Sequence, residues 1–291
     1  PPARRGANPP RRLGPALPAA EAILDLLSTV PGVERGVIAG SFRRGRPTIG
    51  DIDLLIMADD SSAIMEKFVH LESVGRILGH GTGKSSVELL NGMQADLRVL
   101  PAARWGTALN YFTGSQAHNI RLRQRALDRG FSLNEHAFTR QSDGAEILCA
   151  TEDGVYAHLG LPYIPPEIRE DSGEIEAAEA GRLPQLIEMS DIRADLHLHT
   201  DWSDGRASLR EMVLAAKARG RQYIVITDHS QGATIANGLS IERLLAQHEE
   251  VRRIDAEMNG EIRVLHGTEM EIRADGTLDF PDEVLAKLDF V

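Results

Sequence analysis

Hydrophobic and polar positions in the first half of the chain predict a mixed α/β unit. Apolar residues at helical spacing predict helices over residues 18–30 and 62–71. Residues 1–18 are rich in Pro, Arg and Gly and lack a hydrophobic period, which is typical of a tail or linker. Residues 101–160 have a mostly helical pattern. Short apolar runs predict strands over residues 36–39, 52–57, 87–90 and 95–100.

The second half of the chain has a different pattern of predicted elements. A polar, acidic stretch over residues 164–192 predicts a linker, and strands and helices alternate after it. We expect strands over residues 194–198, 223–227 and 262–267, and helices over residues 208–219, 241–258 and 282–288. Repeated β–α units of this length indicate a parallel sheet or barrel. Residues 288–291 resemble the start of another strand, so we expect this barrel to be incomplete at its C-terminus.

Composition sharpens this picture in three ways. The 291 residues carry a net charge of −11, but residues 1–140 are net basic and residues 141–291 strongly acidic, which suggests two domains with different tasks. A basic half can follow a phosphate backbone. The single cysteine, Cys149, excludes an internal disulfide and favours a reducing cytoplasm. No apolar run approaches the ~20 residues of a membrane span.

The most informative motif is a Gly40-Ser41 turn followed by Asp51 and Asp53. Residues i and i+2 of a strand share a face, so the two carboxylates point the same way. Asp96 lies in another predicted strand, and if the two strands are neighbours it completes a cluster of three carboxylates. Such crowded negative charge indicates divalent cations that handle a nucleoside triphosphate.

A second glycine-rich segment, residues 79–85, only superficially matches a phosphate-binding P-loop. Leu78 stands where the first glycine is required, and the spacing is one residue short. We interpret this segment as a loop near the active site, with Lys84 close to DNA.

The segment from Gly40 to Asp53 and the motif Tyr111-Phe112-Thr113-Gly114-Ser115 resemble the beta-like, family X DNA polymerases. The resemblance covers residues 18–160. The resemblance implies catalytic, metal-binding roles for Asp51, Asp53 and Asp96, with Mg²⁺ or Mn²⁺. It implies that the nucleotide is bound by Ser41, Arg44, Gly50, Tyr111, Phe112, Gly114 and Asn119, and DNA by Arg98 and Arg123. The family has a basic residue two positions before its third aspartate, where this chain has Gln94.

Ligand-capable side chains in the second half fall at the ends of successive predicted strands. They are His197, His199, Asp204, His229 and Glu269. Strand ends are where β/α barrels build active sites, and mixed His and carboxylate ligands suit Mn²⁺, Zn²⁺ or Fe. The set resembles the PHP (polymerase and histidinol phosphatase) domain, which implies that all five residues bind Mn²⁺ or Zn²⁺. Asp195 and Asp228 are expected to orient the histidines.

The combination implies an α/β multidomain protein. We expect the end of the fingers region in residues 1–30, a nucleotidyltransferase palm in 31–100, a mostly helical thumb in 101–163, a linker in 164–192, and a PHP domain of partial (β/α) barrel type in 193–291. The resemblance implies a monomeric, cytoplasmic, nucleoid-associated enzyme that fills gaps in primed DNA from dNTPs during repair. Its PHP domain would add Mn²⁺-dependent 3′→5′ exonuclease or phosphoesterase activity.

Two other classes of function stay open from the residues alone. A template-independent nucleotidyltransferase can use the same Gly-Ser and Asp-x-Asp layout, although the segment from Tyr111 to Arg123 argues against it. The PHP-like half can also act as a structural or interaction module. Templated extension and metal content separate these possibilities.

Overall fold

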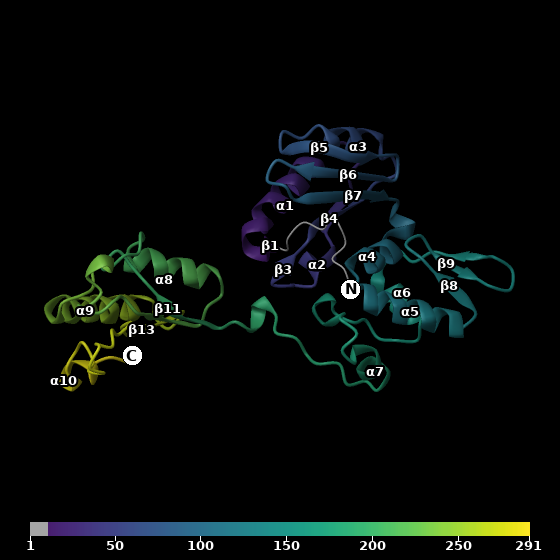
Figure 1. Cartoon of the computed structure of the whole chain (residues 1–291). Coiled ribbons are helices and arrows are strands. Elements are labelled where there is room, and N and C mark those ends of the chain that lie inside the picture. Colours follow the sequence, from purple (N-terminus) through teal and green to yellow (C-terminus); the bar gives the residue numbers. More distant parts are fainter. Residues whose placement is uncertain (1–10) are drawn as a thin grey trace. The chain divides into compact units, whose positions relative to one another are not determined.

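The computed structural model describes residues 11–291, and the chain forms two compact units (Figure 1). The first unit ends at Pro184 and the second begins at Gln185. Residues 1–10, part of the predicted tail, lie outside the described residues. Across residues 11–291, no helix has the length and apolar character needed to cross a membrane.

A five-stranded mixed sheet is the centre of the first unit. Its strands are β2 (Arg35–Ile38), β4 (Asp51–Met57), β5 (Val74–His80), β6 (Lys84–Leu89) and β7 (Gln94–Leu100), in the order β2-β4-β7-β6-β5. β4 and β7 are parallel, and the other pairs are antiparallel. Two helices, α1 (Leu13–Ser28) and α3 (Ser62–Val69), bury their apolar sides against the alternate residues Ile52, Leu54 and Ile56 of β4.

The opposite face of the sheet is covered at one end only. There Leu55 and Leu100 pack with Trp105 and Leu109 of α4 (Trp105–Thr113). Because side chains alternate along a strand, Asp51 and Asp53 lie on this same face, beyond the apolar contact. The carboxylates are therefore attached to a buried, rigid strand while their own end of the face is left uncovered.

The sheet differs from the sequence prediction at its edge. β5 was not expected, because its residues are mostly exposed and carry no apolar alternation. The segment 79–85 is not a loop: β5 and β6 form a hairpin that turns at residues 81–83, with His80 paired to Ser85. Two further short strands, β1 (Arg11–Arg12) and β3 (Thr48–Ile49), pair with each other.

The remainder of the first unit is helical only in part. After α4, the helices α5 (Gln116–Asp128), α6 (Glu152–His158) and α7 (Glu174–Glu179) contribute to a second apolar core that includes Leu122, Phe138 and Tyr156. Residues 131–147 form an antiparallel sheet, so the helical prediction is wrong there. Its strands are β8 (Phe131–Leu133), β9 (Phe138–Arg140) and β10 (Glu146–Ile147), which are too short to give a clear period.

The acidic stretch 164–192 is not extended throughout. Ile164, Ile175 and Ala178 are buried in the second apolar core, so the part of this stretch up to Pro184 belongs to the first unit. Two of its acidic residues pair with basic groups of the first unit instead of facing solvent: Glu174 contacts the buried His118, and Glu170 contacts the partly buried Arg44.

The second unit has a parallel sheet of β11 (Ala194–Leu198), β12 (Tyr223–Ile226) and β13 (Arg263–His266), in that order. α8 (Leu209–Ala218) and α9 (Ile241–Glu257) pack against it through one apolar core. α8 begins with a capping box in which Ser208 and Glu211 satisfy each other's backbone N–H groups. α10 (Asp282–Leu285) follows, and Phe290 forms a parallel bridge with Gly267.

Candidate metal and nucleotide sites

Three carboxylates meet on the uncovered face of the first sheet. β4 and β7 are neighbours with Asp53 directly opposite Asp96, and Asp51 lies on the same face of β4. One oxygen from each of the three carboxylates lies within 4.8 Å of the others. The expectation that Asp96 stands on the strand beside Asp51 and Asp53 is therefore confirmed.

The crowding of negative charge changes the acidity of this cluster. Burial, followed by the charges of Asp51 and Asp96, raises the pKa of Asp53 to about 7, although Lys84 and Arg44 oppose the shift. Burial and Asp96 also raise the pKa of Asp51. Carboxylates that resist ionisation side by side are the donor set that a divalent cation relieves, so these residues fit Mg²⁺ or Mn²⁺.

Gly40 begins the short helix α2 (Gly40–Arg43) and touches the cluster directly. Its φ is +59°, and a Cβ on this residue would lie 2.0 Å from Asp53 Oδ2. Only glycine leaves room for the carboxylate and tolerates this backbone conformation. The Gly-Ser turn and Asp53 are therefore fitted to each other.

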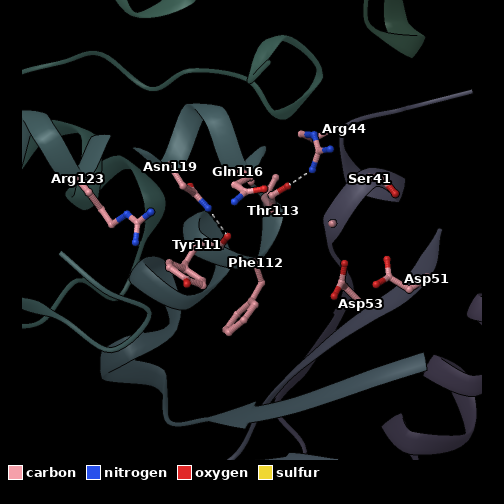
Figure 2. A pocket seen from close by; sticks show the side chains of 12 residues that line it. Ser41, Arg44, Asp51, Asp53, Tyr111, Phe112, Thr113, Gln116, Asn119 and Arg123 are labelled. Carbon is pink, nitrogen blue, oxygen red and sulfur yellow. Dashed lines mark hydrogen bonds between the residues drawn. The ribbon is translucent and has the colours of Figure 1, made fainter. Parts of the chain in front are cut away.

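A cavity of about 550 Å³ opens beside the carboxylates (Figure 2). Its lining includes Ser41 and Arg44 from the segment of α2, Asp51 and Asp53 from β4, and a long stretch of α4 and α5. The predicted site residues in that stretch are Tyr111, Phe112, Gly114, Asn119 and Arg123. Gly50 does not line the cavity, while Asp96 and Arg98 line a smaller adjoining hollow with Asp53 and Phe112.

Internal contacts already orient several of these side chains. The Arg44 Nε donates to Glu170 Oε1 at 2.7 Å, and its Nη1 donates to the carbonyl oxygen of Thr113. The Asn119 amide donates to the carbonyl oxygen of Tyr111 at 2.7 Å. The Arg98 guanidinium lies over the ring of Phe112, 4.3 Å from its centre. These contacts fix the positions of the side chains in the cavity wall.

Sequence reasoning missed the polar contacts behind this wall. Arg43 forms paired hydrogen bonds with Glu152, the first residue of α6, at 2.9 and 2.6 Å. The fully buried Arg169 also donates to Glu152. Thr113 and Gln116 line the cavity as well. No local pattern marks these partners, because they lie far apart in the sequence.

The second unit gathers its predicted ligands at the carboxyl ends of its strands. His197, His199 and Glu269 form one cluster, and His199, Asp204 and His229 form another, so that His199 is shared. Glu269 Oε2 lies 3.0 Å from the Nε2 atoms of both His197 and His199. The buried His229 Nδ1 makes no hydrogen bond, and Glu269 Oε2 is 3.4 Å away. Converging imidazole and carboxylate donors fit Mn²⁺ or Zn²⁺.

The two aspartates expected to orient these histidines do something else. Asp228 accepts hydrogen bonds from Thr200, Ser203 and Gln247. Asp195 pairs with Arg221 at 3.0 Å. Within residues 11–291, neither carboxylate is hydrogen-bonded to a histidine, so the expectation that they orient the histidines is not met by direct contact. Asp228 fixes the loop after β11, which carries Asp204, and Asp195 anchors the start of β12 through Arg221.

The first unit has the fold of a nucleotidyltransferase palm and thumb, and the second has the parallel β/α arrangement and clustered metal ligands of a PHP domain. The models of known protein families that match this chain indicate the same class. Family models described as DNA polymerase beta palm, DNA polymerase beta thumb and PHP domain match residues 19–83, 108–170 and 195–288. The chain belongs to the beta-like, family X DNA polymerases, in the form that carries a PHP domain.

Curated relatives match different shares of this chain. The DNA polymerase/3'-5' exonuclease PolX of Bacillus subtilis (strain 168) is 40% identical over 289 residues, which are 98% of this chain and 50% of that protein. DNA polymerase lambda of Rattus norvegicus is 33% identical over 46% of this chain and 28% of its own length. DNA polymerase lambda of Arabidopsis thaliana is 28% identical over 48% of this chain and 32% of its own length. The chain thus spans half or less of these relatives.

Proposed function

We propose that this chain is the catalytic core of a DNA-directed DNA polymerase that fills gaps during DNA repair. One observation carries the proposal: Asp51, Asp53 and Asp96 converge beside a cavity whose wall combines a hydroxyl, a guanidinium and aromatic side chains. Its substrates are gapped or primed DNA and dNTPs. It acts as a monomer in the cytoplasm, at the nucleoid.

Each part of the cavity has a distinct task in this reaction. Asp51, Asp53 and Asp96 hold Mg²⁺ or Mn²⁺, which neutralises the charge of the transferring phosphoryl group. Ser41 and Arg44 bind the triphosphate, because hydroxyl and guanidinium groups suit phosphate oxygens. Tyr111, Phe112 and Gly114 border the sugar, Asn119 faces the nascent base pair, and Arg98 and Arg123 contact DNA.

The test of the palm is primer extension on a one-nucleotide gap, with Mg²⁺ and with Mn²⁺. Asp51→Asn combined with Asp53→Asn keeps the shape of both side chains and removes their charge. We expect templated dNTP incorporation to fall to the background of the assay, while 3′-end degradation persists and shows that the chain is folded. Incorporation at the unsubstituted rate would refute the assigned centre.

We further propose that the PHP unit cleaves phosphodiesters at DNA 3′ ends with Mn²⁺ or Zn²⁺. Its ligands are His197, His199, Asp204, His229 and Glu269, and their two clusters sharing His199 support a site for more than one ion. His197→Ala should reduce the metal bound per chain, measured by elemental analysis, and abolish 3′-end degradation while sparing dNTP incorporation. Loss of both activities together would contradict two independent centres.

A further inference from the structure

The third carboxylate of the palm is contacted by two side chains to which the resemblance assigned no catalytic role. Gln94 Nε2 donates to Asp96 Oδ1 at 3.0 Å, from two positions earlier on the same strand. Lys84 Nζ lies 3.3 Å from the other oxygen, Asp96 Oδ2. Both oxygens of this carboxylate are therefore oriented by the protein.

The β5–β6 hairpin brings Lys84 to this place. In the antiparallel pairing of β6 with β7, Lys84 is opposite Arg98 and Ser86 is opposite Asp96. Lys84 is thus the diagonal neighbour of Asp96 on the same face of the sheet, a separation that a long side chain can bridge. Its backbone is fixed because the next residue, Ser85, is fully buried and its hydroxyl is 3.0 Å from His80 Nδ1.

The two contacts differ in charge. The Gln94 amide is neutral, so it can orient Asp96 without offsetting the negative charge that Asp51, Asp53 and Asp96 share. Lys84 can do both, and its side chain is 42% exposed, so the contact depends on a mobile, hydrated ammonium group rather than on packing. A partly exposed side chain that is held by a polar contact is typical of a residue that orients a neighbour, and not of a residue that packs in a core.

We propose that Lys84 is a positioning residue of the polymerase centre, which with Gln94 fixes the orientation of Asp96 and offsets the charge of the carboxylate cluster. The inference rests on the proposed polymerase function. Lys84 supplies from the neighbouring strand the positive charge that Gln94 lacks. Because Gln94 already reaches Asp96, an arginine at position 94 should be able to take over this task.

The experiment compares Lys84→Gln, Lys84→Arg and the double variant Lys84→Gln/Gln94→Arg in the full chain. Lys67→Gln is the matched control, since it removes one positive charge from the same unit at a lysine that contacts Thr29 and not the carboxylates. Single-nucleotide gap filling gives kcat and the KM for dNTP. Binding of Mn²⁺ is followed separately by electron paramagnetic resonance, with His197→Ala/His199→Ala in every protein so that the palm is observed.

For Lys84→Gln we expect kcat to fall by roughly 10- to 100-fold with little change in KM, because a misdirected carboxylate weakens positioning of the reacting groups. Mn²⁺ should bind about three- to tenfold more tightly, because a nearby positive charge is gone. Lys84→Arg and the double variant should restore both values toward those of the unsubstituted chain. A purely structural defect would instead weaken metal binding and would not be rescued from position 94.

Three results would overturn the inference: a kcat for Lys84→Gln equal to that of Lys67→Gln, failure of Gln94→Arg to restore the rate, or weaker Mn²⁺ binding by Lys84→Gln. If the unsubstituted chain incorporates no dNTP, the proposed function fails instead. The Mn²⁺ measurement then still decides whether Lys84 acts on the carboxylate cluster.

Discussion

Glu152 lies between two arginines at the junction of palm and thumb, and replacing it with glutamine should destabilise the first unit strongly. Its carboxylate binds Arg43 through two hydrogen bonds and Arg169 through another. The Arg169 side chain has no exposed surface, and its guanidinium carbon lies 5.1 Å from the ring centre of Tyr156. Glu152→Gln would leave this buried cation without its negative partner.

The expected loss follows from the burial of both partners. Breaking a buried ion pair by removing one charge costs about 3–5 kcal/mol, because the remaining charge stays desolvated. Glu146→Gln is the matched control: Glu146 pairs with Arg104 at 2.8 Å but is half exposed. An exposed pair contributes about 0–1 kcal/mol. Glu152→Gln should therefore lower the free energy of unfolding several-fold more than Glu146→Gln does.

Urea-induced unfolding followed by tryptophan fluorescence measures this difference. Trp105 lies in the first unit and Trp202 in the second, so a Trp202→Phe background confines the signal to the palm and thumb. A loss for Glu152→Gln no larger than that for Glu146→Gln would refute the reasoning that burial makes this ion set important.

The pH dependence of stability gives a second check on Glu152. Burial alone would raise its pKa, but hydrogen bonds and charge from Arg43 and Arg169 outweigh burial and hold the pKa below its ordinary value. A carboxyl whose folded pKa is depressed contributes stability that is present above its unfolded pKa and is lost as the pH falls through the folded pKa. The stability gap between the unsubstituted chain and Glu152→Gln should therefore narrow below about pH 4.

Two further predictions concern packing and metal binding. Gly106→Ala should lower the free energy of unfolding by at least about 1–3 kcal/mol in the same assay, because its Cβ would lie 2.2 Å from the Thr151 backbone. Gly154→Ala is the control: its Cβ would lie 3.5 Å from the nearest atom, Thr151 Oγ1, so this substitution should be neutral or slightly stabilising. Burial and neighbouring charge raise the pKa of Asp53 to about 7 in the folded chain, whereas an unfolded aspartate has a pKa near 4. Between these values the folded chain binds a proton that the unfolded chain has released. The free energy of unfolding of the metal-free chain should therefore fall as the pH rises from about 4 to about 7. In the His197→Ala/His199→Ala background, which removes ligands of the second metal site, Mn²⁺ binding at pH 6 should release this proton. Calorimetry in buffers of different ionisation enthalpy detects the release, and Asp53→Asn should remove it.

The carboxylate cluster was predictable because its signal is local. Asp51 and Asp53 sit two residues apart in an apolar strand, and Asp96 lies in a second apolar strand that pairs with it. Buried strands leave a strong hydrophobic pattern, and their alternation fixes which side chains share a face.

The contacts that orient the cluster could not be predicted in this way. Lys84 reaches Asp96 only because a hairpin turn and register shifts between β5 and β6 set where β6 begins. Arg43 and Arg169 both meet at Glu152, which lies 109 residues after Arg43 in the sequence. The strands of residues 131–147 are two or three residues long, and so they are defined by their pairing more than by their own sequence.

The pairing of Arg44 with Glu170 has a consequence for which anions enter the cavity. Because the guanidinium already has a carboxylate partner 2.7 Å away, an arriving anion gains only the difference between its own attraction and that of Glu170. A singly charged phosphate offers little more than the carboxylate it displaces, whereas a polyphosphate chain offers several negative charges. The internal partner should therefore favour molecules with a longer anionic tail over singly charged anions.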